Sequence, residues 1–215
     1  MADMITPYDG DAEFKRNVLA KAEEHEKQDR FIHGIYTSGE NDSEFKGCSL
    51  GCTAHSIVQA SNVGVSNSAA HTPRLSDQIY NFVSTSLKLP IELTKFAEFI
   101  FESTRKAGIY SVARRAEGYS LSWTRRFLES LPADKSFDLV QVNREAFLRG
   151  IDKLSALGED IDCDFVKTLA DKISKGRHLT VSISEFIGGS RSPLSERDII
   201  MAFGDAFIET MENLE

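Results

Sequence analysis

The sequence predicts an all-α protein: a single bundle-like domain of several helices with little or no sheet. Apolar residues recur at spacings of three and four along most of the 215-residue chain, which is the period of an amphipathic helix. Polar cap residues and prolines stand where these periodic segments begin. Only one short segment alternates like a strand, and a hydrophobic content of 41% suffices for a sizeable core.

The first predicted helix spans residues 11–33 and ends near Gly34. Its apolar stripe consists of Phe14, Val18, Ala22 and Ile32. The segment that follows, "IYTSGENDSEFKG", is polar and rich in turn residues, so we expect a loop there. That loop leads into a short helix that carries Cys48 and Cys52.

Prolines mark the helices in the middle of the chain. Thr72 and Pro73 are expected to be the N-cap and first residue of one helix, which follows the loop "NVGVSNSAAH". Leu89–Pro90 separates this helix from a helical stretch over residues 91–115, which is one helix or two. Residues 120–131 form a further predicted helix around a tryptophan.

The C-terminal part is predicted to contain helices over residues 139–157 and 162–173, the second capped by its first aspartate. The segment "HLTVSISEF", residues 178–186, alternates between apolar and hydroxyl side chains. Because one strand cannot form a sheet, we expect an extended linker there. Ser192–Pro193 should open a last helix.

This pattern suggests how the domain is organised. We expect a helical core domain over residues 1–176, followed by residues 177–215 as the extended linker and a C-terminal helix packed on that core. The sequence contains no internal repeat.

Composition bounds the compartment and the partners. The net charge of −8 argues against nucleic acid, whose binding needs a basic face. No apolar run is long enough to span a membrane, and the N-terminus lacks the pattern of a signal peptide. Three cysteines cannot all pair, which favours reduced thiols. We therefore expect a cytoplasmic protein with a protein partner and no membrane contact.

The segment "KGCSLGCTAHS", residues 46–56, is the strongest candidate for chemistry. On a helix, positions i, i+4 and i+7 share a face, so Cys48, Cys52 and His55 could hold one metal ion, with zinc as the candidate. Apart from this candidate zinc, no cofactor is expected. A structural zinc site needs a fourth ligand. The candidates elsewhere in the chain are Asp29, His33 and Cys163. The second cysteine pair of the usual zinc motifs is missing.

Two other interpretations of this segment stay open. In a thiol active site, Cys52 would be the nucleophile, His55 its base and Asp29 the residue that orients the base. In a packing role, the buried cysteines and the small Gly47 and Gly51 would let the helix approach a neighbour closely. The sequence favours packing over either chemical role.

A second cluster lies on the first predicted helix. His25, Asp29 and His33 continue its apolar stripe at i, i+4 and i+8. The simpler interpretation is that the stripe emerges into solvent near the end of the helix. The alternative is that these groups meet the cysteine-histidine segment across a short helix-loop-helix. His71 and His178 stand in polar segments and are expected to be solvated.

The stretches "HEKQDRFIHGIYTSG" and "FKGCSLGCTAHS" resemble the N-terminal part of an uncharacterised family of bacteriophage and prophage proteins with a Gly-Cys-x-x-Gly-Cys-x-x-His segment. The matching positions are His25, Asp29, Gly34, Gly47, Cys48, Gly51, Cys52 and His55. His33 does not match a histidine of the pattern, and residues 89–119 depart from it. The resemblance implies a phage or mobile-element origin and no established activity.

Two functions follow as hypotheses. The first is a phage-type interaction protein that binds a host or phage protein, with a structural or zinc-binding cysteine-histidine helix. The alternative is a small thiol-dependent hydrolase or transferase centred on Cys52 and His55. The sequence carries no phosphate loop and no dinucleotide fingerprint, which favours binding over catalysis.

Overall fold

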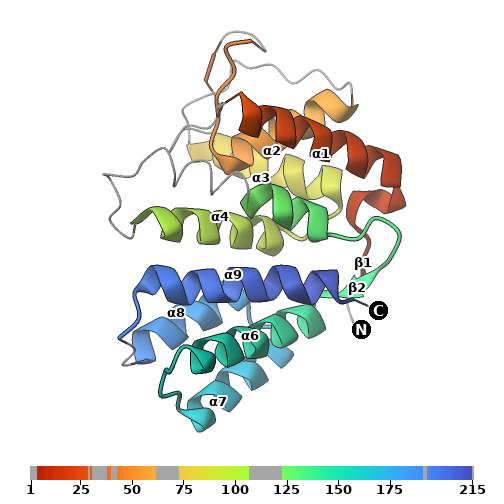
Figure 1. Ribbon diagram of the computed structural model, residues 1–215. Coiled ribbons are helices and arrows are strands. Elements are labelled where there is room, and N and C mark those ends of the chain that lie inside the picture. Colours follow the sequence, from red (N-terminus) through yellow and green to blue (C-terminus); the bar gives the residue numbers. More distant parts are fainter. Residues whose placement is uncertain are drawn as a thin grey trace. The chain divides into compact units, whose positions relative to one another are not determined.

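The computed structural model describes residues 4–28, 30, 38–39, 43–61, 73–106, 123–190 and 193–214 (Figure 1). These residues are almost entirely helical, so the all-α prediction is confirmed. The strands among them are two residues long: β1, Met4–Ile5, pairs antiparallel with β2, Phe137–Asp138. None of the helices in the described residues is both long and apolar enough to cross a membrane.

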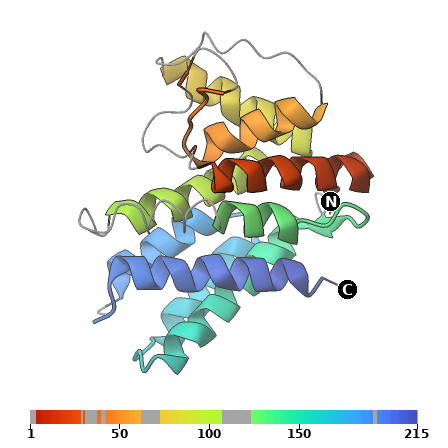
Figure 2. The ribbon, with the colours of Figure 1, turned by 45° about the horizontal axis from the view of Figure 1, so that its top comes forward.

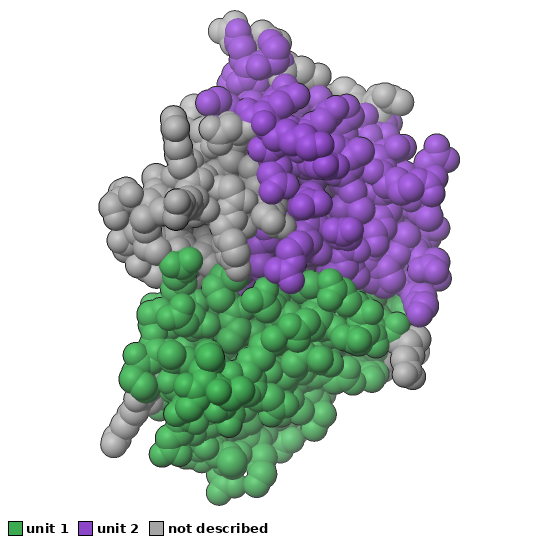
Figure 3. Space-filling model, in the orientation of Figure 1, with its two compact units in different colours: residues 1–5, 102–108, 136–215 green, residues 6–101, 109–135 purple. Residues whose placement is uncertain are grey.

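The chain divides into two compact units, which Figure 3 colours separately. Unit 1 contains Met1–Ile5, Glu102–Gly108 and Ser136–Glu215, and unit 2 contains Thr6–Phe101 and Ile109–Lys135. This division differs from the expected limits at residues 176 and 177. Residues 136–176 and residues 177–215 belong to the same unit, because their helices share one core.

Unit 2 is built around helices from the N-terminal half of the chain. They are the 3-10 helix η1, Pro7–Gly10, and the α-helices α1, Ala12–Lys27, α2, Ser49–Ser61, α3, Pro73–Leu87, and most of α4, Ile91–Lys106, with a further helix over residues 123–130. α2 packs against α1 on one side and α3 on another, and Figures 1 and 2 both show α1 alongside α2.

The predicted starts of α1, α3 and α4 hold. Asp11 caps α1, because its carboxylate accepts hydrogen bonds from the backbone of Glu13 and Phe14 at 2.8 and 2.9 Å. Pro73 is the first residue of α3. The end predicted for the first helix, near residue 33, is wrong, because α1 ends at Lys27 with Gln28 as its C-cap. The end predicted for the stretch over residues 91–115 lies outside the described residues.

Residues 50–57 of α2 are buried, whereas residues 58–61 are partly or fully exposed, and the composition of the buried part explains why its burial is possible. Every residue from 50 to 57 is buried, including the small Gly51 and Ala54. A helix that neighbours surround needs small residues where they approach most closely. Cys48 and Cys52 belong to a core cluster with Phe45, Leu50 and Tyr80.

Long-range hydrogen bonds tie the N-terminal segment to the helix over residues 123–130. The hydroxyl of Tyr8, fully buried, donates to the Leu128 carbonyl at 2.7 Å. Lys15 Nζ donates to the carbonyls of Glu129 and Leu131 at 2.6 and 2.7 Å. These carbonyls lie at the C-terminal end of that helix, where they lack intrahelical donors and where a cation is favoured.

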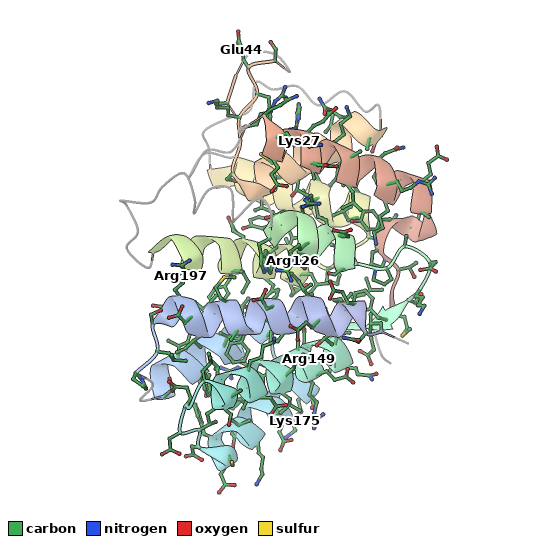
Figure 4. All side chains as sticks on the ribbon, in the orientation of Figure 1. Lys27, Glu44, Arg126, Arg149, Lys175 and Arg197 are labelled. Carbon is green, nitrogen blue, oxygen red and sulfur yellow. The ribbon has the colours of Figure 1, made fainter. Side chains whose placement is uncertain are left out.

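The described residues 136–214 of unit 1 form a helical bundle: α6, Leu139–Ala156, α7, Cys163–Ser174, α8, Leu179–Gly189, and α9, Glu196–Glu212. α6 packs most extensively against α9. Phe147 of α6 stacks on Phe203 of α9 with ring centroids 5.4 Å apart, and Phe186 of α8 meets both rings edge-on. Lys153 and Glu209 join α6 and α9 at 2.6 Å, and the neighbouring Arg149 is labelled in Figure 4.

The expectation of an extended linker over residues 178–186 is wrong, because residues 179–189 form α8. Its buried residues follow a helical spacing: Leu179, Ser182, Ile183 and Phe186. Val181, which a strand would place with its apolar neighbours, is 43% exposed. The alternation was misleading because the buried stripe includes a serine. The C-terminal helix beyond it is confirmed as α9, but it begins at Glu196 with Ser195 as its N-cap, and not at Pro193 as predicted.

Candidate functional site

The centre of the candidate site is a pair of buried histidines that α1 and α2 bring together. His25 Nε2 lies 2.8 Å from His55 Nδ1, and the two residues are 1% and 7% exposed. His25 and Val18 are the buried residues of α1, seven positions apart on the face toward α2. The expectation that this stripe emerges into solvent at His25 is therefore wrong. The alternative, in which it meets the second helix, holds for His25.

A chain of hydrogen bonds fixes the orientation of both rings. Ser56 Oγ lies 2.8 Å from the Cys52 carbonyl, which can only accept, so the serine hydrogen points there. Ser56 Oγ therefore accepts from His25 Nδ1 at 3.1 Å. A neutral His25 protonated at Nδ1 has a bare Nε2, which accepts from His55 Nδ1. The structure thus assigns one polarity to the whole chain, from His55 to His25, Ser56 and the α2 backbone.

The surroundings of His25 keep its ring neutral. Burial, and next the neighbouring His55 and Arg30, lower the pKa of His25 to about 4, against a smaller opposing effect of Glu24. A neutral ring is the state that the hydrogen-bond polarity requires. His25 therefore carries no charge near neutral pH.

Phe45 completes the site, and it was not among the residues predicted from the sequence. Its ring stacks on His55 with centroids 3.8 Å apart and planes 6° apart, and its centroid is 5.5 Å from that of His25. An antiparallel bridge positions the segment, with Ser38 and Lys46 exchanging backbone hydrogen bonds of 2.7 and 3.1 Å. Gly39 has a φ of +95°, and a side chain there would collide with the Glu44 backbone.

The two thiols of the motif are buried rather than presented to solvent. Cys48 and Cys52 are 8% and 3% exposed. Cys52 Sγ lies 3.3 Å from the Gly47 carbonyl and 3.9 Å from the Arg30 carbonyl, so its hydrogen is directed to backbone oxygens. Burial, and next the neighbouring Cys48, raise the pKa of the Cys52 thiol far above neutral pH. Cys52 is therefore a protonated thiol, and its hydrogen-bond contacts within the described part of the chain are with backbone carbonyls.

The described residues do not bring the predicted metal ligands together in one site. Among the described residues, no group of three or more His, Cys, Asp or Glu side chains is arranged to hold a metal ion, and Cys48, Cys52 and His55 all belong to that part of the chain. Asp29, His33 and His71 lie outside the described residues. Cys163 is exposed at the start of α7 in unit 1, and His178 is exposed at the start of α8, as expected.

Ser56 and Phe45 were missed by sequence reasoning for different reasons. Ser56 follows His55 directly and could have been recognised, since i to i−4 bonding of a helical serine is common. Phe45 comes from a loop, and its place over His55 depends on the turn at Gly39.

No protein-family model, curated protein or solved structure matches this chain at a significant level.

Proposed function

We propose that this chain is a phage- or mobile-element-type interaction protein that acts in the host cytoplasm by binding a host or phage protein, and that it is not a thiol enzyme. The observation that carries the proposal is the state of Cys52: a buried, protonated thiol hydrogen-bonded to a backbone carbonyl. The cysteine-histidine segment then serves to assemble α1, α2 and the loop before α2 into one core.

The alternative of a thiol-dependent hydrolase or transferase has less support. A nucleophilic cysteine needs a lowered pKa, solvent access and a base within hydrogen-bonding distance. Cys52 has the opposite pKa shift, and His55 Nδ1 pairs with His25. A structural role accounts for the same residue types without further groups, because cysteine, glycine and a fully hydrogen-bonded histidine all suit a tightly packed helix.

The charge of the chain suggests the kind of partner. A net charge of −8 repels nucleic acid and favours a protein with a basic face, because complementary charge accelerates encounter. Measured binding should therefore weaken as salt is raised.

Thiol accessibility tests the structural role of the segment. In the native protein, iodoacetamide at neutral pH should alkylate Cys163, which is exposed, and leave Cys48 and Cys52 unmodified until denaturant is added. The Cys163→Ser variant is the matched control and should show no reaction in the native state. Rapid native alkylation of Cys52, slowed by His55→Gln, would instead support the thiol enzyme.

The binding function needs a purified partner. Affinity capture from a bacterial lysate with the tagged chain should recover a protein that Cys163→Ser also captures, since that thiol is remote from the motif in sequence. Titration of this purified protein should give a saturable Kd that rises with salt. Failure of every captured protein to bind saturably would contradict the proposal.

A further inference from the structure

Unit 2 contains a small, partly open cavity between its helices. Its volume is about 20 Å³. The residues that line it come from α2, α3, the turn after α3, α4 and the helix over residues 123–130. They are mostly aliphatic, and the polar ones are three threonines, one on each of three helices: Thr53, Thr94 and Thr124.

The Thr94 hydroxyl is the unusual group in this cavity. Thr94 is 2% exposed, and its Oγ1 has no hydrogen-bond partner among the described residues. Other helical threonines of this chain are satisfied by the carbonyl four residues earlier: Thr210 donates to Ala206 at 2.8 Å and Thr168 to Asp164 at 2.9 Å. A buried hydroxyl without a partner is unfavourable, so a partner within the cavity is expected.

We propose that this cavity binds one water molecule, hydrogen-bonded to Thr94 Oγ1. About 10–15 Å³ of such space is needed for a water, so 20 Å³ admits one water and excludes an organic ligand of several heavy atoms. A buried water needs two to four polar partners. A hydroxyl has one donor and two acceptor positions, so Thr53 and Thr124 can each contact the water in addition to the bonds they already make.

This water would connect three helices through their threonines. α2 carries Thr53, α4 carries Thr94, and the helix over residues 123–130 carries Thr124. Leu87 and Leu89 form part of the apolar wall, so the hydrogen bonds of the water are directed to these hydroxyls. The site is independent of the histidine pair and of the proposed binding function.

Oxygen-17 relaxation dispersion of water tests this site, because it detects long-lived internal water and is blind to hydroxyl protons. In the full-length protein, Thr94→Val should lower the dispersion amplitude by the equivalent of one water. Thr94→Ser, which keeps the hydroxyl, should retain the amplitude. Thr210→Val is a control at a satisfied threonine and should also leave it unchanged.

Thermal unfolding gives a second readout. If the water is bound, Thr94→Val removes one of its partners and should lower Tm; if the cavity is dry, the same change removes an unsatisfied hydroxyl at equal volume and should raise Tm. An unchanged dispersion amplitude in Thr94→Val, or a raised Tm, overturns the proposal. If Thr94→Val fails to fold, the Thr53→Ala and Thr124→Ala variants decide the question. A long-lived water signal that either variant diminishes supports the proposal, and the absence of such a signal overturns it.

Discussion

His25 illustrates how a titratable residue can serve a buried core. Both of its ring nitrogens are hydrogen-bonded, one to His55 and one to Ser56, so burial leaves no polar atom of the ring unsatisfied. The neutral form can meet both partners, because Ser56 can accept and His55 can donate. Protonation would place a charge in a site that is 1% exposed.

The first prediction is that this histidine makes the protein less stable in acid. The pKa of His25 is about 4 when folded and about 6.5 when unfolded, so the unfolded state binds the extra proton first as pH falls. The free energy of unfolding contributed by this site is complete above pH 6.5 and falls between pH 6.5 and 4, by on the order of 3 kcal/mol. Urea unfolding at a series of pH values measures it.

A pair of variants separates His25 from the other acid-sensitive groups. His25→Gln should lower stability at pH 7 and flatten the decline between pH 6.5 and 4. His178→Gln, at an exposed histidine, should leave the decline as it is in the parent chain. An equally steep decline in His25→Gln would show that other groups cause it.

For single residues, the sequence predicted which side chains are buried better than it predicted their chemical roles. The composition of the segment around Cys52 indicated a closely packed helix, and Cys48, Cys52 and His55 are indeed buried. The partner of His55 could not be chosen, because the pattern also fitted an ion or a thiol base. That choice depends on which face α1 turns toward α2, a tertiary property that spacing along one helix does not determine.

Three helix ends show how elements stop in this fold. After α3, Lys88 adopts a φ of +55° and the Leu89 amide donates to the Ser84 carbonyl at 2.8 Å. After α6 and α7, Gly158 and Gly176 take the same place with φ values of +89°. This is the αL termination that glycine adopts without strain, so Lys88 carries a cost that the glycines avoid.

The second prediction follows from this comparison. Lys88→Gly should raise the free energy of unfolding by about 1 kcal/mol, because it relieves the left-handed backbone. Gly176→Ala should lower it by about 1 kcal/mol, although a Cβ there meets no atom within 4 Å, so that the loss is conformational. Chemical denaturation of the two variants measures both. Changes of the same sign would contradict the explanation.

The third prediction concerns the contact between α6 and α9. A Cβ on Gly150 would overlap the ring of Phe203, whose position is fixed by its stack on Phe147. Gly150→Ala should therefore destabilise by about 1–3 kcal/mol. Gly188→Ala, at a helical glycine where a Cβ meets nothing, is the matched control and should be neutral or slightly stabilising. Thermal unfolding compares them, and equal effects would argue against close packing at Gly150.

For the helices of unit 1, the spacing of apolar residues predicted each element correctly except α8. α6, α7 and α9 were expected because large apolar residues mark their buried faces. α8 was missed because Ser182 occupies a buried position while Val181 is exposed, so polarity and burial disagree at two adjacent residues. Only the neighbouring helices, which supply the core around Phe186, decide between the two periods.

The division of the whole molecule could not be predicted from the sequence. Residues 136–215 form one unit with the N-terminal strand β1, although residues 6–101 and 109–135 of the other unit lie between them. No proline- or glycine-rich linker marks residue 136, and the limit expected at residue 176 lies inside a unit. Which helices share a core is set by long-range contacts such as Phe147 with Phe203.

The last prediction uses fragments to test this division. A chain of residues 136–215 keeps α6, α7, α8 and α9 with their phenylalanine cluster, and it keeps the ion pairs of Lys153 with Glu209 and Lys172 with Glu185. It loses only the short β1–β2 pairing among the strands described. We expect it to give a helical circular dichroism spectrum and a cooperative urea transition.

A chain of residues 1–176 is the decisive comparison, because it ends where the sequence suggested a core domain. It removes α8 and α9, so Phe147 on α6 loses both aromatic neighbours and the face of α6 that packs on α9 is left exposed. An apolar helix face that is exposed to solvent promotes aggregation. We expect this fragment to aggregate or to unfold at lower urea than the full chain. A soluble 1–176 fragment with the stability of the full chain, beside an unfolded 136–215 fragment, would instead place the boundary at residue 176.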